Sequence, residues 1–467
     1  MRDSHSPREF QNMTVLFETD WLASNPVFFN RKTGLASKNP QEVTVYSGDI
    51  KFHPEGLYNY LEYGYSVFEQ TPIEDVQFLP PAARLLKDHH GKLSVEKLPD
   101  PIEKWWDYRL NEEDVIELIR TRVQEWEASL PLDQEIVLPL SGGYDSRLLL
   151  WCLNNKDRVR AYTYGISEDQ GRSTEIVHAR ALADFFRLRW AQIPLGGFHQ
   201  YFDDWDAEFG VSTHSHGMYH FEFYSSIRES LKGNQAFLSG IIGDSWAGSI
   251  LKKKLRTANY LSQLSYSHGL CAEPNQIELQ ISHDLRDQFW AENSERLEDH
   301  RFQVVTSMRF KLILLSYLIR IPQLFDFQPW SPFLDIDVAM AMLNLPHERR
   351  ANRQWQFDFF SKVGLDLENQ GLKSNRTNTL DYQAMKRQPL NPLDLRLLSK
   401  LFDENYINWI NSNINISTLS EARSNIFAIP KFGGLLRRFG IKDPTLEAYS
   451  AYLCLKPLEN FLYRACT

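Results

Sequence analysis

The residues best suited to chemistry follow a short apolar run, 135–140, whose branched side chains predict a buried parallel strand. The run leads into Ser141, Gly142, Gly143, Tyr144, Asp145 and Ser146. Glycines lack a Cβ, so the backbone can turn tightly here and approach a ligand closely. The apolar residues 148–153 predict a helix, and the free N–H groups and positive dipole at its start attract anions. The pattern predicts a phosphate-binding loop.

A second strand followed by glycines lies at 236–249. Its polar and glycine positions are Ser239, Gly240, Gly243, Asp244 and Gly248. Asp145 and Asp244 come from separate loops, and together they can bind Mg²⁺, which prefers a few protein oxygens plus phosphate and water. An aspartate in a glycine turn can instead cap the following helix. With both loops present, we predict the metal role for Asp145 and Asp244.

The first loop, Ser-Gly-Gly-x-Asp-Ser, resembles the pyrophosphate loop of the ATP pyrophosphatase superfamily. The resemblance implies that Asp145 binds Mg²⁺. It also implies an ATP and pyrophosphate site formed by Ser141, Gly142, Gly143, Tyr144, Ser146, Ser239, Gly240 and Gly243. The Gly-x-x-x-x-Gly-Lys-Ser/Thr pattern of P-loop enzymes is absent from the sequence. An ordinary glycine turn before a helix is the alternative interpretation.

The second loop resembles that of the asparagine synthetase group, Ser-Gly-x-Gly-x-Asp-Glu-x-x-x-Gly, and Pro-Phe-Leu-Asp at 332–335 also matches that group. We expect 332–335 to be structural. Ser245 replaces the family's glutamate, which helps to receive the amine, and this argues against aspartate plus ammonia as the reaction. The resemblance implies that Lys373 contacts the α phosphate, with Arg376 as the second candidate. A surface lysine remains the alternative for Lys373.

Strands and helices alternate after residue 108. Residues 111–130 and 174–186 have the apolar period of helices, and 159–166 predict a second strand. The fold class predicted is α/β, a doubly wound parallel sheet like that of adenine nucleotide α-hydrolases. Ligands of such sheets bind at the carboxyl ends of the strands. We expect Tyr164 and Gly165 to line an adenosine pocket there, although Tyr164 can equally serve sheet packing.

Residues 1–107 predict a small β-rich domain, with short alternating runs such as 42–46. The succession from Gly56 to the Trp-Trp-Asp at 105–107 resembles the end of an Ntn-type glutaminase domain. Those glutaminases use an N-terminal cysteine thiolate as nucleophile, whereas this sequence has Arg2 and no cysteine before Cys152. We expect a reduced, inactive glutaminase-like domain over 1–107, followed by a synthetase domain over 108–467 with a helical C-terminal part.

Composition excludes several classes of protein. A net charge of −9 over 467 residues argues against nucleic acid or a membrane surface as partner. The four cysteines show no CxxC pairing, which fits a reducing compartment, and the histidines at 214, 216 and 220 lack the spacing of a zinc site. No signal peptide and no uninterrupted apolar span is evident, and the stretch 304–322 carries three cations. We expect a cytoplasmic protein.

The resemblance implies an ATP-dependent amide ligase that uses ATP and Mg²⁺. Its substrates would be a small-molecule or peptide carboxylate and an amine donor. The amine can be ammonia, ammonia from a partner, or a group of the substrate itself, as in β-lactam synthetases and lasso-peptide cyclases. Asparagine synthesis, amidation of a sugar acid, and nucleotide binding without turnover stay open. A homodimer is a further possibility.

Overall fold

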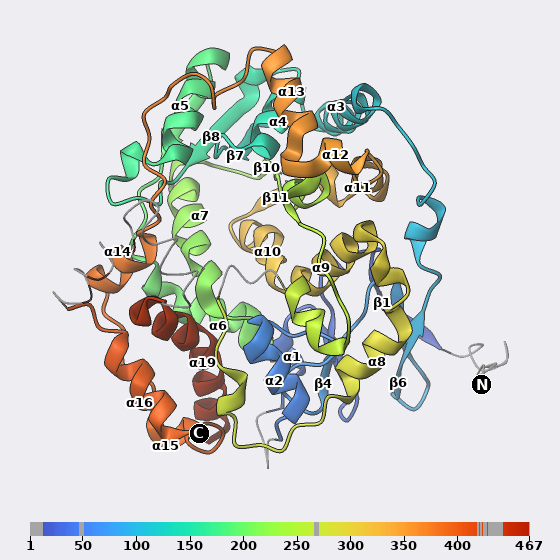
Figure 1. Ribbon diagram of the computed structural model, residues 1–467, viewed down its shortest axis with the longest axis vertical. Helices are drawn as coiled ribbons and strands as arrows, with labels where there is room; N and C mark the ends of the chain where they lie inside the picture. Colours follow the sequence, from blue (N-terminus) through green and yellow to red (C-terminus); the bar gives the residue numbers. More distant parts are fainter. Residues whose placement is uncertain are drawn as a thin grey trace.

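The computed structural model describes residues 13–45, 51–265, 270–417 and 442–466, together with 420, 423 and 427. Arg2 and Tyr46, on which two sequence predictions rest, lie outside them. The described chain is an α/β structure with one parallel sheet, two small antiparallel sheets and many helices (Figure 1).

The parallel sheet has five strands in the order β11-β10-β7-β8-β9. They are β7 (Ile136–Pro139), β8 (Val159–Thr163), β9 (Arg189–Gln192), β10 (Gln235–Leu238) and β11 (Phe327–Trp330). Strands β7, β8 and β9 progress toward one edge, and β10 and β11 progress toward the other. The order therefore changes direction between β7 and β10, and loops that leave the carboxyl ends at such a point diverge and open a crevice. Both predicted glycine loops begin there.

Helices cover both sides of this sheet (Figure 1). The elements concerned are α3 (Glu112–Ser129), α4 (Tyr144–Cys152), α5 (Thr174–Phe186) and α7 (Tyr219–Ser230). The predicted helices at 111–130 and 174–186 are thus confirmed. Helix α3 buries the apolar stripe that predicted it, including Val115, Ile119 and Val123. From α7, the Tyr224 ring packs 5.5 Å from the Phe237 ring of β10.

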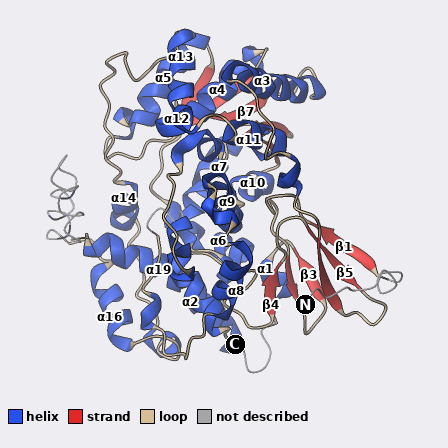
Figure 2. Ribbon diagram, turned by 45° about the vertical axis from the view of Figure 1, so that its right-hand side comes forward, coloured by secondary structure: helices blue, strands red, loops and turns tan. Residues whose placement is uncertain are grey.

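The N-terminal part is β-rich, as expected, and forms two three-stranded antiparallel sheets at the side of the molecule (Figure 2). Their orders are β1-β5-β6 and β3-β2-β4. The strands are β1 (Thr14–Glu18), β2 (Phe28–Asn30), β3 (Leu35–Ser37), β4 (Val76–Phe78), β5 (Ala83–Lys87) and β6 (Leu93–Lys97). A small core of its own, with Val27, Phe29 and Leu85, lies between them.

One prediction in this part was wrong. The run 42–46 predicted a strand, but α1 (Pro40–Val43) occupies its start. Asn39 accepts a hydrogen bond from the Gln41 N–H, and Pro40 stands at the first helical position, so the local cap overrides the alternation.

The N-terminal part shares the main core of the molecule. Helix α2 (Pro54–Tyr63) ends at Gly64, whose φ is 78°, and its apolar side chains belong to one buried cluster that extends to the C-terminal helix. The Tyr60 hydroxyl donates to the Cys454 carbonyl at 2.8 Å. The boundary proposed at 107/108 stays a prediction, and the packing here joins the two regions across it.

The rest of the chain is mainly helical, as predicted for the C-terminal part. Its helices are α6 (Phe202–Phe209), α8 (Asp284–Asn293), α9 (His300–Leu315), α10 (Tyr317–Leu324), α11 (Ile336–Leu343), α12 (His347–Arg350), α13 (Gln354–Lys362), α14 (Leu380–Arg387), α15 (Leu395–Leu398), α16 (Glu404–Asn413) and α19 (Pro444–Cys466). Helix α9 is buried on nearly all sides. Among the described residues, no helix combines the length and apolar character needed to cross a membrane.

Candidate functional site

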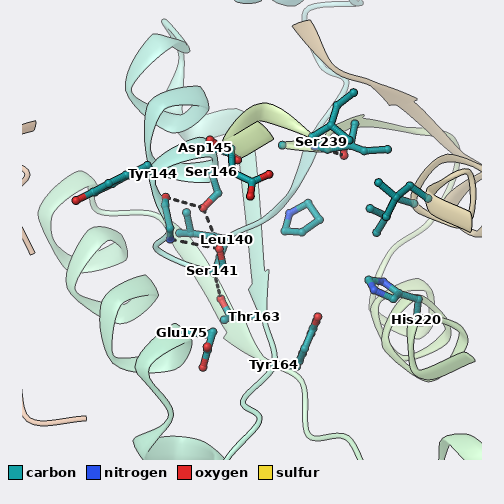
Figure 3. A pocket seen from close by; sticks show the side chains of 18 of the residues that line it. Leu140, Ser141, Tyr144, Asp145, Ser146, Thr163, Tyr164, Glu175, His220 and Ser239 are labelled. Carbon is teal, nitrogen blue, oxygen red and sulfur yellow. Dashed lines mark hydrogen bonds between the residues drawn. The ribbon is translucent and has the colours of Figure 1, made fainter. Parts of the chain in front are cut away.

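The first glycine loop joins β7 to α4. Gly142 has φ +71°, and a Cβ there would lie 2.3 Å from the His178 Cβ on α5, so only glycine fits. The Gly143 N–H donates to Ser141 Oγ at 3.3 Å, and the Ser146 hydroxyl lies 3.4 Å from Ser141 Oγ. Figure 3 shows Ser141, Asp145 and Ser146 gathered at the start of α4. The loop therefore gathers hydroxyl groups at the N-terminus of a helix, an arrangement suited to an oxyanion.

A buried ion pair fixes this loop from behind. The Arg147 guanidinium donates to the Gly142 carbonyl at 2.7 Å and to both carboxylate oxygens of Glu368 at 2.9 and 3.0 Å. Arg147 is fully buried, and its hydrogen bonds lower the pKa of Glu368. A two-pronged pair of this kind holds orientation as well as charge, so the loop is anchored before any ligand arrives.

The second glycine loop packs directly on Asp145. A Cβ on Gly243 would lie 2.8 Å from the Asp145 Cγ, and one on Gly240 would lie 3.3 Å from the Asp145 Cβ. Asp244 follows, and like Asp145 it lines a cavity of about 520 Å³ between the two loops. Figure 3 shows Ser239 across from Asp145. The structure thus brings the two predicted carboxylates together.

The Asp145 carboxyl has a strongly shifted pKa. Burial raises the pKa of Asp145 to about 8, and the charge of Asp244 adds to the increase. Arg353, the Asp244 backbone and Gln356 act in the opposite direction, although the Gln356 amide forms no hydrogen bond of normal geometry within the described part of the chain. Asp145 Oδ1 is buried and has no hydrogen-bond partner among the described residues. A divalent cation would satisfy this oxygen and balance both carboxylates.

The two carboxylates would need other ligands to complete a metal shell. Among the described residues, no group of three or more histidine, cysteine, aspartate or glutamate side chains is arranged to hold a metal ion. Mg²⁺ commonly takes one or two carboxylates and completes its shell with phosphate oxygens and water. The donor set therefore fits Mg²⁺ bound together with a phosphate compound.

Two cations that the sequence interpretation missed line the cavity, Lys311 from α9 and Arg353. Lys311 is 1% exposed, and burial lowers its pKa to about 7 while Asp244 opposes that shift. Arg353 has φ +57°, and its guanidinium lies 4.8 Å from the centre of the Tyr144 ring. The signal for Lys311 in the sequence was its place within the largely apolar stretch 304–322, where a cation is costly to bury without a function.

The predicted catalytic cations lie elsewhere. Neither Lys373 nor Arg376 lines the cavity, and both are exposed. Their segment lies beside the start of α5, where the Thr174 N–H donates to the Asn375 carbonyl at 3.0 Å. The proposed role of Lys373 and Arg376 stays a prediction, and the cavity has two other cations.

Most of the remaining predicted residues line the cavity, and three glycines support it from outside. The lining contains Ser141, Gly143, Tyr144, Asp145, Ser146, Tyr164, Ser239, Gly240 and Asp244. Gly142, Gly165 and Gly243 do not line it. At Gly165 a Cβ would lie 2.3 Å from the Gln170 carbonyl oxygen, so this glycine permits close chain packing. Figure 3 shows the Tyr144 ring directed away from Asp145, and it stacks 5.5 Å from the Phe360 ring.

The wall opposite the loops is aromatic. Tyr164, Tyr224, Tyr317 and Phe223 line it together with His220. The Tyr164 and Phe223 ring centres are 5.1 Å apart, and burial raises the pKa of Tyr164 to about 12. Burial lowers the pKa of His220 to about 3, so this imidazole is neutral. The wall offers rings and neutral hydroxyl groups to a ligand.

The three histidines at 214–220 do different things. His214 accepts a hydrogen bond from the His216 N–H, as a residue near a helix start does, and His216 pairs with Asp381 at 3.3 Å. His220 faces the cavity (Figure 3). His214 thus stabilises a helix start, whereas His220 belongs to the cavity lining.

The Pro-Phe-Leu-Asp segment supports the second loop. Phe333 is fully buried, and a Cβ on Gly243 would lie 2.7 Å from its ring. The Trp246 indole donates to the Phe333 carbonyl at 2.9 Å, and the Trp21 indole donates to the Leu334 carbonyl at 2.8 Å. These contacts are structural, as the sequence predicted.

Comparisons with known proteins add no family to this geometry. No protein-family model matches the chain, and no curated protein matches it.

Proposed function

We propose that the protein is an ATP-dependent amide ligase that adenylates a carboxylate and then transfers the acyl group to an amine. A carboxylate oxygen attacks the α phosphorus of ATP, and pyrophosphate leaves. The amine nitrogen next attacks the acyl carbon, loses a proton, and displaces AMP. The fold proposed is a doubly wound sheet of the adenine nucleotide α-hydrolase kind.

One observation carries this proposal. Two strand-to-glycine loops leave neighbouring strands at the point where the strand order changes direction, and they place the half-buried Asp145 and Asp244 on the lining of one cavity. Pairs of phosphate-binding loops at such a point are a recurring solution for nucleotides. Asp145 Oδ1, buried and without a partner among the described residues, supports the fit of a cation.

Each wall of the cavity has a proposed task. The hydroxyl groups of Ser141 and Ser146 bind the pyrophosphate, and Mg²⁺ held by Asp145 and Asp244 would neutralise charge as the pyrophosphate departs. Lys311 donates to phosphate oxygens, and the incoming negative charge returns it to the charged form. Cations already aimed at developing charge need little rearrangement during the reaction.

The aromatic wall is the proposed site of the carboxylate and the amine. His220 is buried and Tyr164 and Tyr317 are half-buried there, and all three are uncharged because desolvation moves each pKa toward the neutral form. Such a wall stacks against a ring or an apolar chain and excludes water from the acyl-adenylate. Ser245 lines the cavity where the resembling loops carry a glutamate, so aspartate plus ammonia is not the preferred reaction. Ammonia, ammonia from a partner, and an amine of the substrate itself stay as nitrogen sources.

The test is product analysis after incubation with Mg-ATP and a panel of carboxylates and amines that includes aspartate with ammonium. We expect AMP and pyrophosphate with at least one carboxylate, and none in Asp145→Ala. Asp133→Ala is a matched control, because Asp133 is exposed and remote from the cavity lining.

Three results would contradict the proposal. Release of ADP would show that the β–γ bond is cut instead. Tight binding of Mg-ATP with no turnover across the panel would favour a nucleotide-binding protein. Equal activity in Asp145→Ala and Asp133→Ala would place the chemistry outside the described cavity.

A further inference from the structure

A second cavity, of about 420 Å³, lies outside the proposed active site. It forms where the end of α11 and α12 meet the start of α9 and the chain before α3, helices that Figure 1 shows close together. Its charged lining includes Arg109, Lys252, Asp299, His300, Arg301 and Arg350. No residue lines both cavities.

Positive charge exceeds negative charge in this second cavity. Four cationic side chains line it, against the two carboxylates of Glu298 and Asp299. The Arg301 guanidinium donates to both carboxylate oxygens of Asp299, to Oδ2 at 2.7 Å and to Oδ1 at 3.2 Å. Arg109 donates to two backbone carbonyls, and Lys252 forms no ion pair within the described part of the chain. The charges of Arg109 and Lys252 therefore remain available to a ligand.

The deepest cation has an open donor. Arg350 is 4% exposed, and its Nε donates to the Leu345 carbonyl at 3.2 Å. Its Nη1 is buried and has no hydrogen-bond partner among the described residues. A buried guanidinium donor without an acceptor is costly, because the group has left water without compensation. An anion in the cavity would supply that acceptor.

The neighbouring His300 is also affected by the positive charge of this cavity. His300 Nε2 lies 3.0 Å from the Ile250 carbonyl, and its buried Nδ1 has no partner in the described chain. Burial lowers the pKa of His300 to about 4, and the charge of Arg350 and, less strongly, of His347 and Lys252 contributes. The positive potential therefore extends across the cavity rather than belonging to one side chain.

We propose that this second cavity binds a phosphate group, either free or carried by a small molecule. Arg350 and Arg109 supply planar donors that match phosphate oxygens, and Lys252 supplies a point charge. The cavity is larger than a single phosphate group needs, which leaves room for a small molecule that carries the phosphate. The inference goes beyond the proposed ligase activity and does not depend on it.

The site has a short route to the proposed active site. Arg350 lies three residues before Arg353, which lines the first cavity, and both Asn352 and Arg353 have positive φ. A Cβ on Gly248 would lie 2.0 Å from the Arg350 carbonyl oxygen, so the chain that follows Asp244 packs on Arg350. The same turn therefore contributes residues to both cavities.

Calorimetry with inorganic phosphate and with glycerol 3-phosphate tests the proposal on the full chain in EDTA. We expect binding by the wild type, and at least fivefold weaker binding in Arg109→Ala and in Lys252→Ala. Lys254→Ala is the matched control, because Lys254 is an exposed lysine of the same segment that does not line the cavity. Tighter binding of glycerol 3-phosphate than of phosphate would indicate that the cavity binds a phosphorylated small molecule. Equal binding of the two probes would indicate that it binds free phosphate.

Arg350→Lys keeps the charge and removes the planar fork, so it should weaken binding while circular dichroism stays that of the wild type. The proposal is overturned if neither probe binds at millimolar concentration. It is also overturned if Lys254→Ala weakens binding as much as Lys252→Ala, or if Arg109→Ala and Lys252→Ala both bind as the wild type does.

Discussion

The two cavities are built around different ionisable groups, a pair of carboxyl groups in the first and a group of cations in the second. In the first, Asp145 and Asp244 are pressed together, and burial raises the pKa of Asp145 to about 8. In the second, Arg109, Lys252 and Arg350 gather, and the carboxylate of Asp299 is bound by Arg301. Within the described chain, each cavity contains a buried polar atom without a hydrogen-bond partner. That atom is a carboxyl oxygen of Asp145 in the first cavity and a guanidinium nitrogen of Arg350 in the second.

This difference indicates that a buried ionisable group with an unpartnered atom favours a ligand of opposite charge. Folding rarely leaves such groups unpaired, since a buried donor or acceptor without a partner costs about 1–3 kcal/mol, and more for a charged group. The first cavity therefore fits the proposed cation together with phosphate, and the second fits the proposed anion. Four predictions test this contrast.

The largest effect on catalysis is expected at Lys311, in the first cavity. Lys311→Met should lower kcat/KM for AMP formation by about 100-fold or more, because a buried charge aimed at phosphate is lost. Lys373→Met, at the exposed lysine that the loop resemblance suggested, should change it by less than about threefold. Steady-state assays of pyrophosphate release measure both, and a larger loss in Lys373→Met would return the catalytic role to that lysine.

The second prediction concerns the glycine where the segment after Asp244 meets Arg350. Gly248 has φ +120°, and a Cβ would lie 2.0 Å from the Arg350 carbonyl oxygen. Gly248→Ala should lower the free energy of unfolding by about 3 kcal/mol, through backbone strain and the clash together. Gly364→Ala is the matched control, with φ +74° and no neighbour within 4 Å, and should cost about 1 kcal/mol. Urea unfolding compares them, and equal costs would show that the contact with Arg350 yields easily.

The third prediction concerns pH and the metal-free acidic pair. The Asp145 carboxyl keeps its proton up to about pH 8 when folded, whereas an unfolded aspartate loses it near pH 4. Its contribution to stability is therefore full below about pH 4 and is lost as the pH rises to about 8. An asparagine side chain at this position does not ionise and would carry no such loss.

In EDTA, Asp145→Asn should therefore stabilise the protein little at pH 5 and by about 2–4 kcal/mol at pH 8, with no further gain above pH 9. Thermal unfolding at several pH values measures the trend, and the exposed Asp133→Asn serves as reference. A gain that is largest at pH 5 would contradict the raised pKa of Asp145.

The smallest effect is expected at Arg353. Its guanidinium lies 4.8 Å from the centre of the Tyr144 ring and lowers the pKa of Asp145. Arg353 itself is only half-buried at the first cavity. Arg353→Met should raise KM for ATP about five- to tenfold, a loss of about 1 kcal/mol typical of a half-exposed cation. Arg376→Met should leave KM unchanged. Similar values for the two variants would remove Arg353 from the proposed site.

Much of the central fold follows from local sequence. The strands before the two loops, the helices at 112–129 and 174–186, and the helical C-terminal part have strong apolar periods, and these elements form as predicted. Strands β9 and β11 were not predicted. Both are short edge strands with few buried residues, and Pro329 lies within β11, so their pairing depends on neighbours rather than on pattern.

The candidate site was predictable only in part, for a related reason. Loops such as 141–146 carry their chemistry in adjacent residues, so a single sequence displays it. Lys311 and Arg353 come from α9 and from a turn after α12, and nothing near either residue in sequence identifies its partner. The same holds for Arg350 and Lys252 in the second cavity.

The sequence by itself determined the two strand–glycine loops, because the turn, the open helix start and the aspartate are all local features. The tertiary structure alone decided which charges meet. It brought Asp145, Asp244 and Lys311 to the lining of one cavity, and it gathered three further cations around Arg350 in the other. Those contacts depend on the crossing of strands and helices that are far apart in the chain, and burial then sets how strongly each charge requires a partner.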